Sequence, residues 1–314
     1  MVSLNKRRIV VLGSFVADLA FHVNALPAWG ETRMGSSFAV GPGGKGSNQA
    51  VAAARAGGDV CFITKLGKDP FGDMARALYR EEGIDTNFIA STQNPTGAAA
   101  IILDEKRGEN AIIIVPGACF EITTNEVDVA HGAIASSSVF VAQLELPVPV
   151  VEHGLQLARA CGVTTILNPA PALPLSDSIY PLCDYLTPNE SEAEALTGVA
   201  VEDLRGAERA AEILLARGVR NVALTLGENG VLLKSREMTA HVPAIRAGAV
   251  VETTGAGDAF NGGLAVALAE GKEFREAARF ACAVAGISVT RRGTAPSMPR
   301  REEVEALLAS TLDD

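Results

Sequence analysis

Strand-like apolar runs alternate with helix-like runs over most of this 314-residue chain, and this alternation constrains the fold more than any other feature. The strand-like runs are at 8–12, 60–66, 138–143, 163–167, 184–187 and 221–226. The helical patterns are at 43–58, 70–82, 148–161, 189–197, 203–217, 257–270, 273–290 and 301–310. Strands that alternate with helices predict an α/β fold with a mostly parallel sheet and helices on both faces.

Two β-rich segments, at about 14–42 and 96–117, interrupt this alternation. In the second, AAAIILD and NAIIIV flank the polar turn EKRGE, which is a hairpin pattern. We expect the two segments to assemble into one small sheet. No internal repeat or low-complexity linker divides the chain, so we interpret residues 1–314 as a single domain that carries this sheet.

Composition excludes several classes of partner. The net charge is −10, so the chain has no electrostatic footprint for nucleic acid or an anionic membrane, and any phosphate must be held locally. No apolar stretch approaches the roughly 20 residues of a membrane span, and the apolar run at the N-terminus is too short for a signal peptide. The five cysteines are scattered and lack C-x-x-C spacing, which favours reduced thiols in the cytoplasm. The four histidines form no visible metal-ligand cluster.

The stretch ETTGAGDAFNGG, residues 252–263, places three small residues directly before Asp258 at the expected start of a helix. A helix N-terminus presents unpaired N–H groups and the positive end of the helix dipole, so it attracts anions. Asp258 could be no more than a favourable first-turn anion, or it could accept the proton of a hydroxyl that attacks phosphorus. The string alone is a weak signal, since G-x-G also occurs in dinucleotide sites, where it follows the first strand.

A second glycine cluster, GPGGKGSNQA at 41–50, also precedes a helix. It is not a Walker A loop, because Lys45 is followed by Gly46. It is either a flexible turn or a polyol site at which Lys45 and Asn48 supply donors.

Other polar groups have two possible roles as well. Asp18 could be a turn residue, whereas Glu145 follows an apolar strand, a position that favours ligand contact in an α/β sheet. Asn189 and Glu192 share a helix face, either as a capped helix start or as part of a site. The glycine turn at 225–230 is either a hairpin turn or a cradle for a nucleotide.

Taken together, GPGGKGSNQA, TPNESEAE, TLGENG and ETTGAGDAFNGG resemble the ribokinase family of sugar kinases in order and spacing. The resemblance runs from VVLGS at 10–14 to RRGTAPSMP at 291–299 and includes AQLELP and LNPAP. It implies a Rossmann-like central sheet with a small β lid that mediates homodimers. It also implies transfer of the ATP γ-phosphate to the primary hydroxyl of a sugar, with D-ribose the first expectation, and a need for magnesium and a potassium-type cation.

The resemblance assigns roles to individual residues. Asp258 matches the catalytic base, and the backbone of Gly255, Ala256 and Gly257 matches the anion hole. The implied sugar-contacting residues are Asp18, Gly44, Lys45, Asn48 and Glu145. The implied nucleotide residues are Thr225, Leu226, Gly227, Glu228, Asn229 and Gly230, with Cys282 beside the adenine. Asn189 and Glu192 match a motif that organises magnesium and phosphate, through water. The implied monovalent-cation residues are Glu252, Thr254, Ser288, Arg291, Gly293 and Ser297.

Two positions depart from the expected pattern. Val16 stands where the resemblance leads us to expect Asn, and Glu252 stands where it leads us to expect Asp. The first bears on which sugar is the substrate, and the second on the affinity or selectivity for the cation. Alternative hypotheses are a kinase of the same family for another pentose, a ketohexose or a nucleoside, and a non-catalytic sugar-binding regulator. The intact Asp258, Asn189 and Glu192 argue against the regulator.

Overall fold

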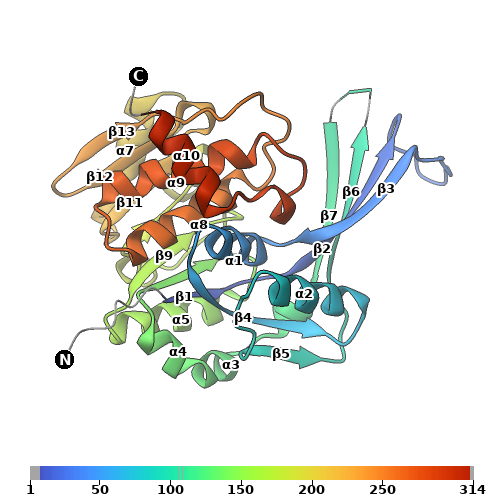
Figure 1. The fold of residues 1–314 in the computed structure, drawn as a ribbon, viewed down its shortest axis with the longest axis horizontal. Coiled ribbons are helices and arrows are strands. Elements are labelled where there is room, and N and C mark those ends of the chain that lie inside the picture. The colour runs from blue at the N-terminus through green and yellow to red at the C-terminus, as the bar shows by residue number, and fades with distance from the viewer. Residues whose placement is uncertain (1–7, 105, 108, 312–314) are drawn as a thin grey trace.

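A nine-stranded central sheet organises the molecule (Figure 1). The structure, a computed structural model, describes residues 8–104, 106–107 and 109–311; the segment 1–7, which bears on the expected lack of a signal peptide, lies outside them. The strand order is β13-β12-β11-β10-β9-β8-β1-β4-β5. Their bounds are β1 Arg8–Leu12, β4 Asp59–Gly67, β5 Ile89–Thr92, β8 Val139–Gln143, β9 Thr164–Asn168, β10 Tyr185–Leu186, β11 Asn221–Thr225, β12 Val231–Ser235 and β13 Thr239–Val242. All neighbours from β11 to β5 pair in parallel, which confirms the predicted α/β class.

Helices cover both faces of this sheet because its strands are apolar on both sides. On β1, Ile9 and Val11 belong to one hydrophobic cluster, whereas Val10 and Leu12 belong to the other. The first cluster includes α1 Lys45–Arg55, α2 Pro70–Glu81, α8 Ala256–Ala269, α9 Phe274–Ser288 and α10 Arg301–Ser310. The second includes α3 Thr124–Val129, α4 His131–Ser136, α5 Val148–Ala160, α6 Glu190–Thr197 and α7 Leu204–Ala216.

The predicted small sheet is present and stands to one side of the helices in Figure 1. Its strands are β2 Val16–Val23, β3 Ser37–Gly43, β6 Thr96–Asp104 and β7 Glu109–Gly117, in the order β3-β2-β6-β7. Strand β2 pairs antiparallel with β3 and parallel with β6. We call this sheet the lid.

Several elements are not apparent from the sequence pattern. Strands β5, β12 and β13 and the short helices α3 and α4 are four to six residues long, too short for a clear period. The glycine turn after β11 forms a short 3₁₀ helix, Gly227–Asn229, and joins β11 to the antiparallel β12, so it is indeed a hairpin turn. Within the described residues, no helix is long and apolar enough to cross a membrane.

The carboxyl ends of the parallel strands bring the expected site residues together. Asn168 ends β9, Thr187 follows β10 directly and Thr225 ends β11. Glu145 lies just beyond the end of β8. Because parallel strands present their carboxyl ends at one edge, these side chains share the edge at which open α/β sheets bind ligands.

Candidate active site

The N-terminus of α8 forms the centre of the site. Gly255 caps this helix with φ +82°, a left-handed conformation that glycine adopts without the steric cost of a Cβ. Asp258 lies in the first turn and is 6% exposed. The N-terminus of a helix favours an anion, so the buried carboxylate of Asp258 lies next to a position at which an anion can bind.

Two amides hold the carboxylate of Asp258. Asn48 Nδ2 donates to its Oδ2 and Gln49 Nε2 donates to its Oδ1, both over 3.0 Å. Asn48 and Gln49 lie in the first half of α1, which packs against α8. The side-chain oxygen of Asn48 is buried and has no hydrogen-bond partner within the described part of the chain, which leaves one acceptor for a ligand.

Tight backbone geometry at the start of α1 explains the second glycine cluster. Gly44 caps the helix at φ +88°, and a Cβ there would lie 2.7 Å from the backbone nitrogen of Val16. A Cβ on Gly43 would lie 2.3 Å from Oδ2 of Asp18. Glycine at both positions therefore lets the lid strand β2 and its carboxylate lie directly against the turn that enters α1.

Carboxylates crowd the site and share one lysine. Burial, with Glu145, Asp258 and Glu252 nearby, raises the pKa of Asp18 to about 6. Burial raises the pKa of Glu145 too, although Ser14 and the backbone N–H of Lys45 donate to it. Burial alone would lower the pKa of Lys45, but the carboxylates of Asp258, Glu145 and Glu192 raise it. Lys45 is therefore held as a cation in the middle of the anionic groups.

Asn189 and Glu192 fulfil the capping role that the sequence left open, and they also face the site. Glu192 N donates to Asn189 Oδ1 over 2.8 Å, and Asn189 N donates to Glu192 Oε2 over 2.9 Å. Burial raises the pKa of Glu192. Both side chains line a cavity, so a capping role does not exclude a role in the site.

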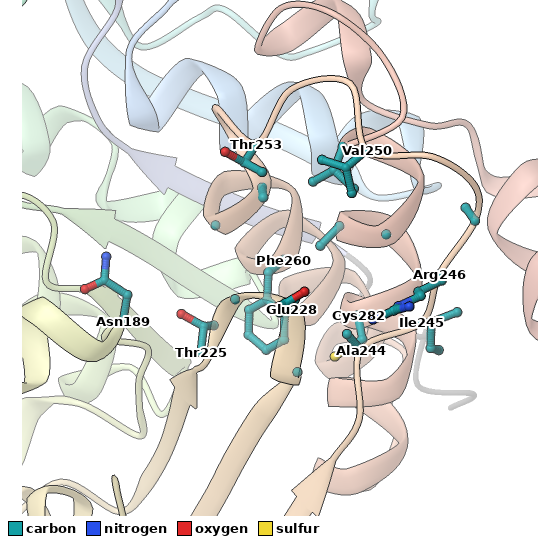
Figure 2. A pocket seen from close by; sticks show the side chains of 18 of the residues that line it. Asn189, Thr225, Glu228, Ala244, Ile245, Arg246, Val250, Thr253, Phe260 and Cys282 are labelled. Atoms are coloured by element: carbon teal, nitrogen blue, oxygen red, sulfur yellow. The ribbon is translucent and has the colours of Figure 1, made fainter. Parts of the chain in front are cut away.

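Two cavities meet at the N-terminus of α8. The smaller, about 140 Å³, contains Asp258, Lys45, Asn168 and Glu192 in its wall. The larger, about 660 Å³, runs between the hairpin of β11 and β12 and the helix α9. Figure 2 shows Asn189 and Thr225 at one end of the larger cavity and Ile245, Arg246 and Cys282 at the other. Asn189, Thr225 and Gly257 line both cavities, so molecules bound in the two would meet beside Gly257 and Asp258.

The segment before α8 and the segment that begins at the end of α9 carry the residues expected to bind a monovalent cation. Gly293 N donates to Glu252 Oε2 over 2.9 Å, and the N–H groups of Val251 and Glu252 donate to Val289 O. The hydroxyls of Ser288 and Ser297 are buried and each donates to a backbone carbonyl. The two segments are thus held together by hydrogen bonds from backbone N–H groups. No group of three or more His, Cys, Asp or Glu that could hold a metal occurs in residues 8–311 as far as they are described.

Six of the expected nucleotide residues, Thr225 to Gly230, lie on the hairpin of β11 and β12, whereas Cys282 lies on α9. Thr225, Gly227, Glu228, Gly230 and Cys282 line the larger cavity, whereas Leu226 and Asn229 are not among its lining residues. The sequence patterns did not indicate Gln49, Asn168, Thr187 or Asn261. The last three line the smaller cavity, and Gln49 donates to Asn168 and Asp258 in its wall. The ends of β9 and β10 could have indicated Asn168 and Thr187, by the argument that pointed to Glu145.

Comparison with known proteins decides the family. The sequence model of the pfkB family carbohydrate kinases matches residues 6–301. The chain belongs to this family. It is a carbohydrate kinase, and the fold expected from the motifs is the fold observed.

Relatives of this kinase cover nearly its whole length. A ribokinase of Haemophilus influenzae is 41% identical over 95% of this chain and 97% of the relative. A deoxyribokinase of Salmonella typhi is 36% identical over 96% of this chain and 98% of the relative. Among solved structures, an Arabidopsis thaliana ribokinase complexed with ribose and ATP covers 96% of this chain and 98% of its own, with a TM-score of 0.90 and 32% identity.

Proposed function

We propose that this kinase transfers the γ-phosphoryl group of ATP to the primary hydroxyl of D-ribose, giving D-ribose 5-phosphate. The observation that carries the proposal is the meeting of two cavities at the first turn of α8, beside a buried carboxylate. The larger cavity has room for a nucleotide. The smaller cavity contains acceptors and a lysine suited to a polyol. The ribokinase relatives support this choice of sugar.

The roles follow from the chemistry of phosphoryl transfer. The sugar oxygen bonds to the γ-phosphorus, the bond from that phosphorus to the bridging oxygen breaks, and ADP leaves. Asp258 accepts the hydroxyl proton, and the backbone of Gly255, Ala256 and Gly257 at the N-terminus of α8 stabilises charge on the phosphoryl oxygens. Asp18, Lys45, Asn48 and Glu145, with the backbone at Gly44, hold the sugar. The hairpin residues Thr225 to Gly230 and Cys282 border the nucleotide.

Magnesium fits the same site. Asn189 and Glu192 stand on the wall shared with the phosphate cradle, and Glu192 keeps Oε1 unused by its capping bond. Carboxylate and amide oxygens suit this ion, which usually keeps several waters. We propose that these two residues hold the magnesium–ATP complex through water.

We also propose a monovalent-cation site between the loops that carry Glu252, Thr254, Ser288, Arg291, Gly293 and Ser297. Backbone carbonyls there are independent of the Glu252 side chain, whose Oε2 accepts from Gly293 N. Potassium chloride should therefore raise the kcat several-fold over tetramethylammonium chloride at equal ionic strength. Equal rates in the two salts would remove this site from the proposal.

The second candidate function is a kinase for 2-deoxyribose, favoured by Val16 and by the deoxyribokinase relative. Val16 and Asp18 are two residues apart in β2, so their side chains lie on the same face of the strand. Val16 is 5% exposed. Valine cannot hydrogen-bond a hydroxyl, so it could pack against a sugar that lacks one. A panel of ribose, 2-deoxyribose, ribulose, fructose and adenosine, read as ADP release, separates the candidates. Ribose should give the highest kcat/KM. If another compound exceeds ribose tenfold, that compound replaces ribose in the proposal.

The substitution Val16→Asn tests the same position. If ribose is the substrate, an unpaired hydroxyl costs about 1–3 kcal/mol, so the KM for ribose should fall by about 5- to 150-fold in the variant. Val16→Ala, which removes bulk without adding a donor, is the matched control and should not lower this KM. A variant Val16→Asn that loses activity on 2-deoxyribose, in an enzyme that ignores ribose, would support the second candidate.

We propose that the lid forms a homodimer. By the strand register, Phe21, Phe38, Val40, Ile113 and Val115 share the face opposite to Asp18 and are 40–64% exposed. Sedimentation at micromolar concentration should give a dimer for the native chain and a monomer for Ile113→Asp.

We further propose a cytoplasmic location, supported by five cysteines that are all free. Secretion into the periplasm in cell fractionation would refute it.

A further inference from the structure

A chain of buried amides lies beneath Asp258, and its orientation is set far from the carboxylate. Asn168 Nδ2 donates to the backbone carbonyl of Thr187 over 3.0 Å. Because a carbonyl only accepts, the amide nitrogen of Asn168 must face Thr187 and its Oδ1 must face the other way. That Oδ1 accepts from Gln49 Nε2 over 3.1 Å.

The amide of Gln49 is therefore fixed in one orientation. Its Nε2 donates both to Asn168 Oδ1 and to Asp258 Oδ1, and its Oε1 accepts from Gln143 Nε2 over 2.7 Å. Gln49 and Gln143 are each 1% exposed. A flipped Gln49 amide would set its oxygen against two acceptors and its nitrogen against a donor. The side chain thus presents an N–H group to Asp258 regardless of what is bound in the cavities.

We propose that Gln49 is a positioning residue that aims the carboxylate of Asp258. A donor fixed on one carboxylate oxygen restricts rotation of the group. Asn48 donates to the other oxygen, but its own Oδ1 has no partner within the described residues and is left for the proposed sugar. Gln49 is therefore the donor whose orientation does not depend on substrate. This inference rests on the proposed role of Asp258.

The test measures single-turnover phosphorylation by rapid quench at saturating ribose and ATP, across pH. Gln49→Met keeps the shape of the side chain and removes the donor. The rate should fall by about 10- to 100-fold, while ribose and ATP affinities measured by calorimetry stay near those of the wild type. Gln49→Glu donates only when protonated, so its rate should fall further as pH rises.

Controls separate this role from simple packing. Asn221→Leu removes another amide that donates to a backbone carbonyl, that of Asp184, at the opposite edge of the sheet, and should leave rate and profile unchanged. Gln143→Met keeps Gln49 but removes the donor to its Oε1, so it should lower the rate by less than Gln49→Met does. This variant serves as the test if Gln49→Met does not fold. A Gln49→Met rate within threefold of wild type overturns the proposal, as does equal loss of rate and of both affinities. If Asp258→Asn is also active, the proposed role of Asp258 as the base fails, whereas a wild-type enzyme that does not phosphorylate ribose refutes the proposed function itself.

Discussion

Replacing Asp258 with Asn should reduce the kcat by about 10²- to 10⁴-fold, the range typical of a general base, while ribose still binds. The side chain keeps its size, but an amide cannot accept the hydroxyl proton. Asn48 and Gln49 both donate toward this position, so the new amide group must set its own N–H against one of them. Steady-state kinetics and ribose calorimetry on the same preparation measure the two quantities separately.

Asp203→Asn is the matched control for a helix-start carboxylate. Asp203 caps α7, where its Oδ1 accepts from Gly206 N over 2.7 Å, and it lies outside both cavities. Asparagine caps helices as well as aspartate, so this variant should keep both stability and kcat. An Asp258→Asn enzyme with more than a tenth of the wild-type kcat would show that Asp258 is only a favourable first-turn anion.

The sequence could predict the central sheet because its strands are buried on both faces. Runs such as RIVVL and NVALT leave no polar face, and long helices separate them, so the length and order of the elements are unambiguous. The edge of the sheet was less predictable. Strand β10 has only two residues in its ladder, and β12 and β13 extend the sheet through a hairpin whose turn also reads as a nucleotide cradle.

The site was predictable where glycines and charges mark it and not where neutral amides form it. Gly44 and Gly255 adopt positive φ at helix starts, a demand visible in the sequence as missing side chains. Gln49, Asn168 and Thr187 act through bonds between α1 and two strands that are more than 100 residues away in sequence. No local pattern distinguishes such an amide from one on a solvent-exposed helix face, because its role depends on tertiary contacts.

Asp18→Asn is the second substitution with a large expected effect. Asparagine keeps one acceptor oxygen but loses the charge and the second acceptor. Each charge-assisted bond from a sugar hydroxyl to a carboxylate contributes about 1.5–3 kcal/mol, so loss of one such bond should weaken ribose binding by about 10- to 10²-fold. Within the described residues Asp18 has no hydrogen bond or ion pair of its own, which leaves both oxygens for the sugar. Calorimetry with ribose measures the loss, and an Asp18→Asn affinity within fivefold of wild type would remove Asp18 from the sugar site.

The pH dependence of Asp18 has a definite sign in both binding and stability. Its pKa is raised from 3.8 to about 6, first by burial and then by neighbouring carboxylates, so the folded chain holds this proton more tightly than the unfolded chain. The contribution of Asp18 to stability therefore falls as pH rises from about 4 to about 6 and stays low above that. Asp18→Asn should be about 1 kcal/mol more stable than wild type at pH 7, a value reduced for solvent screening in the open site.

Ribose binding to wild type should change in the opposite direction to stability. Below the Asp18 pKa of about 6 the sugar must displace a proton, so the affinity should fall by about tenfold between pH 7 and pH 5. The Asp18→Asn variant has no such proton to lose, and its weak binding should be nearly independent of pH over this range. Thermal unfolding and ribose titrations at pH 5 and 7 test both signs. A wild-type affinity that does not change over this range would show that ribose does not require the ionised carboxylate.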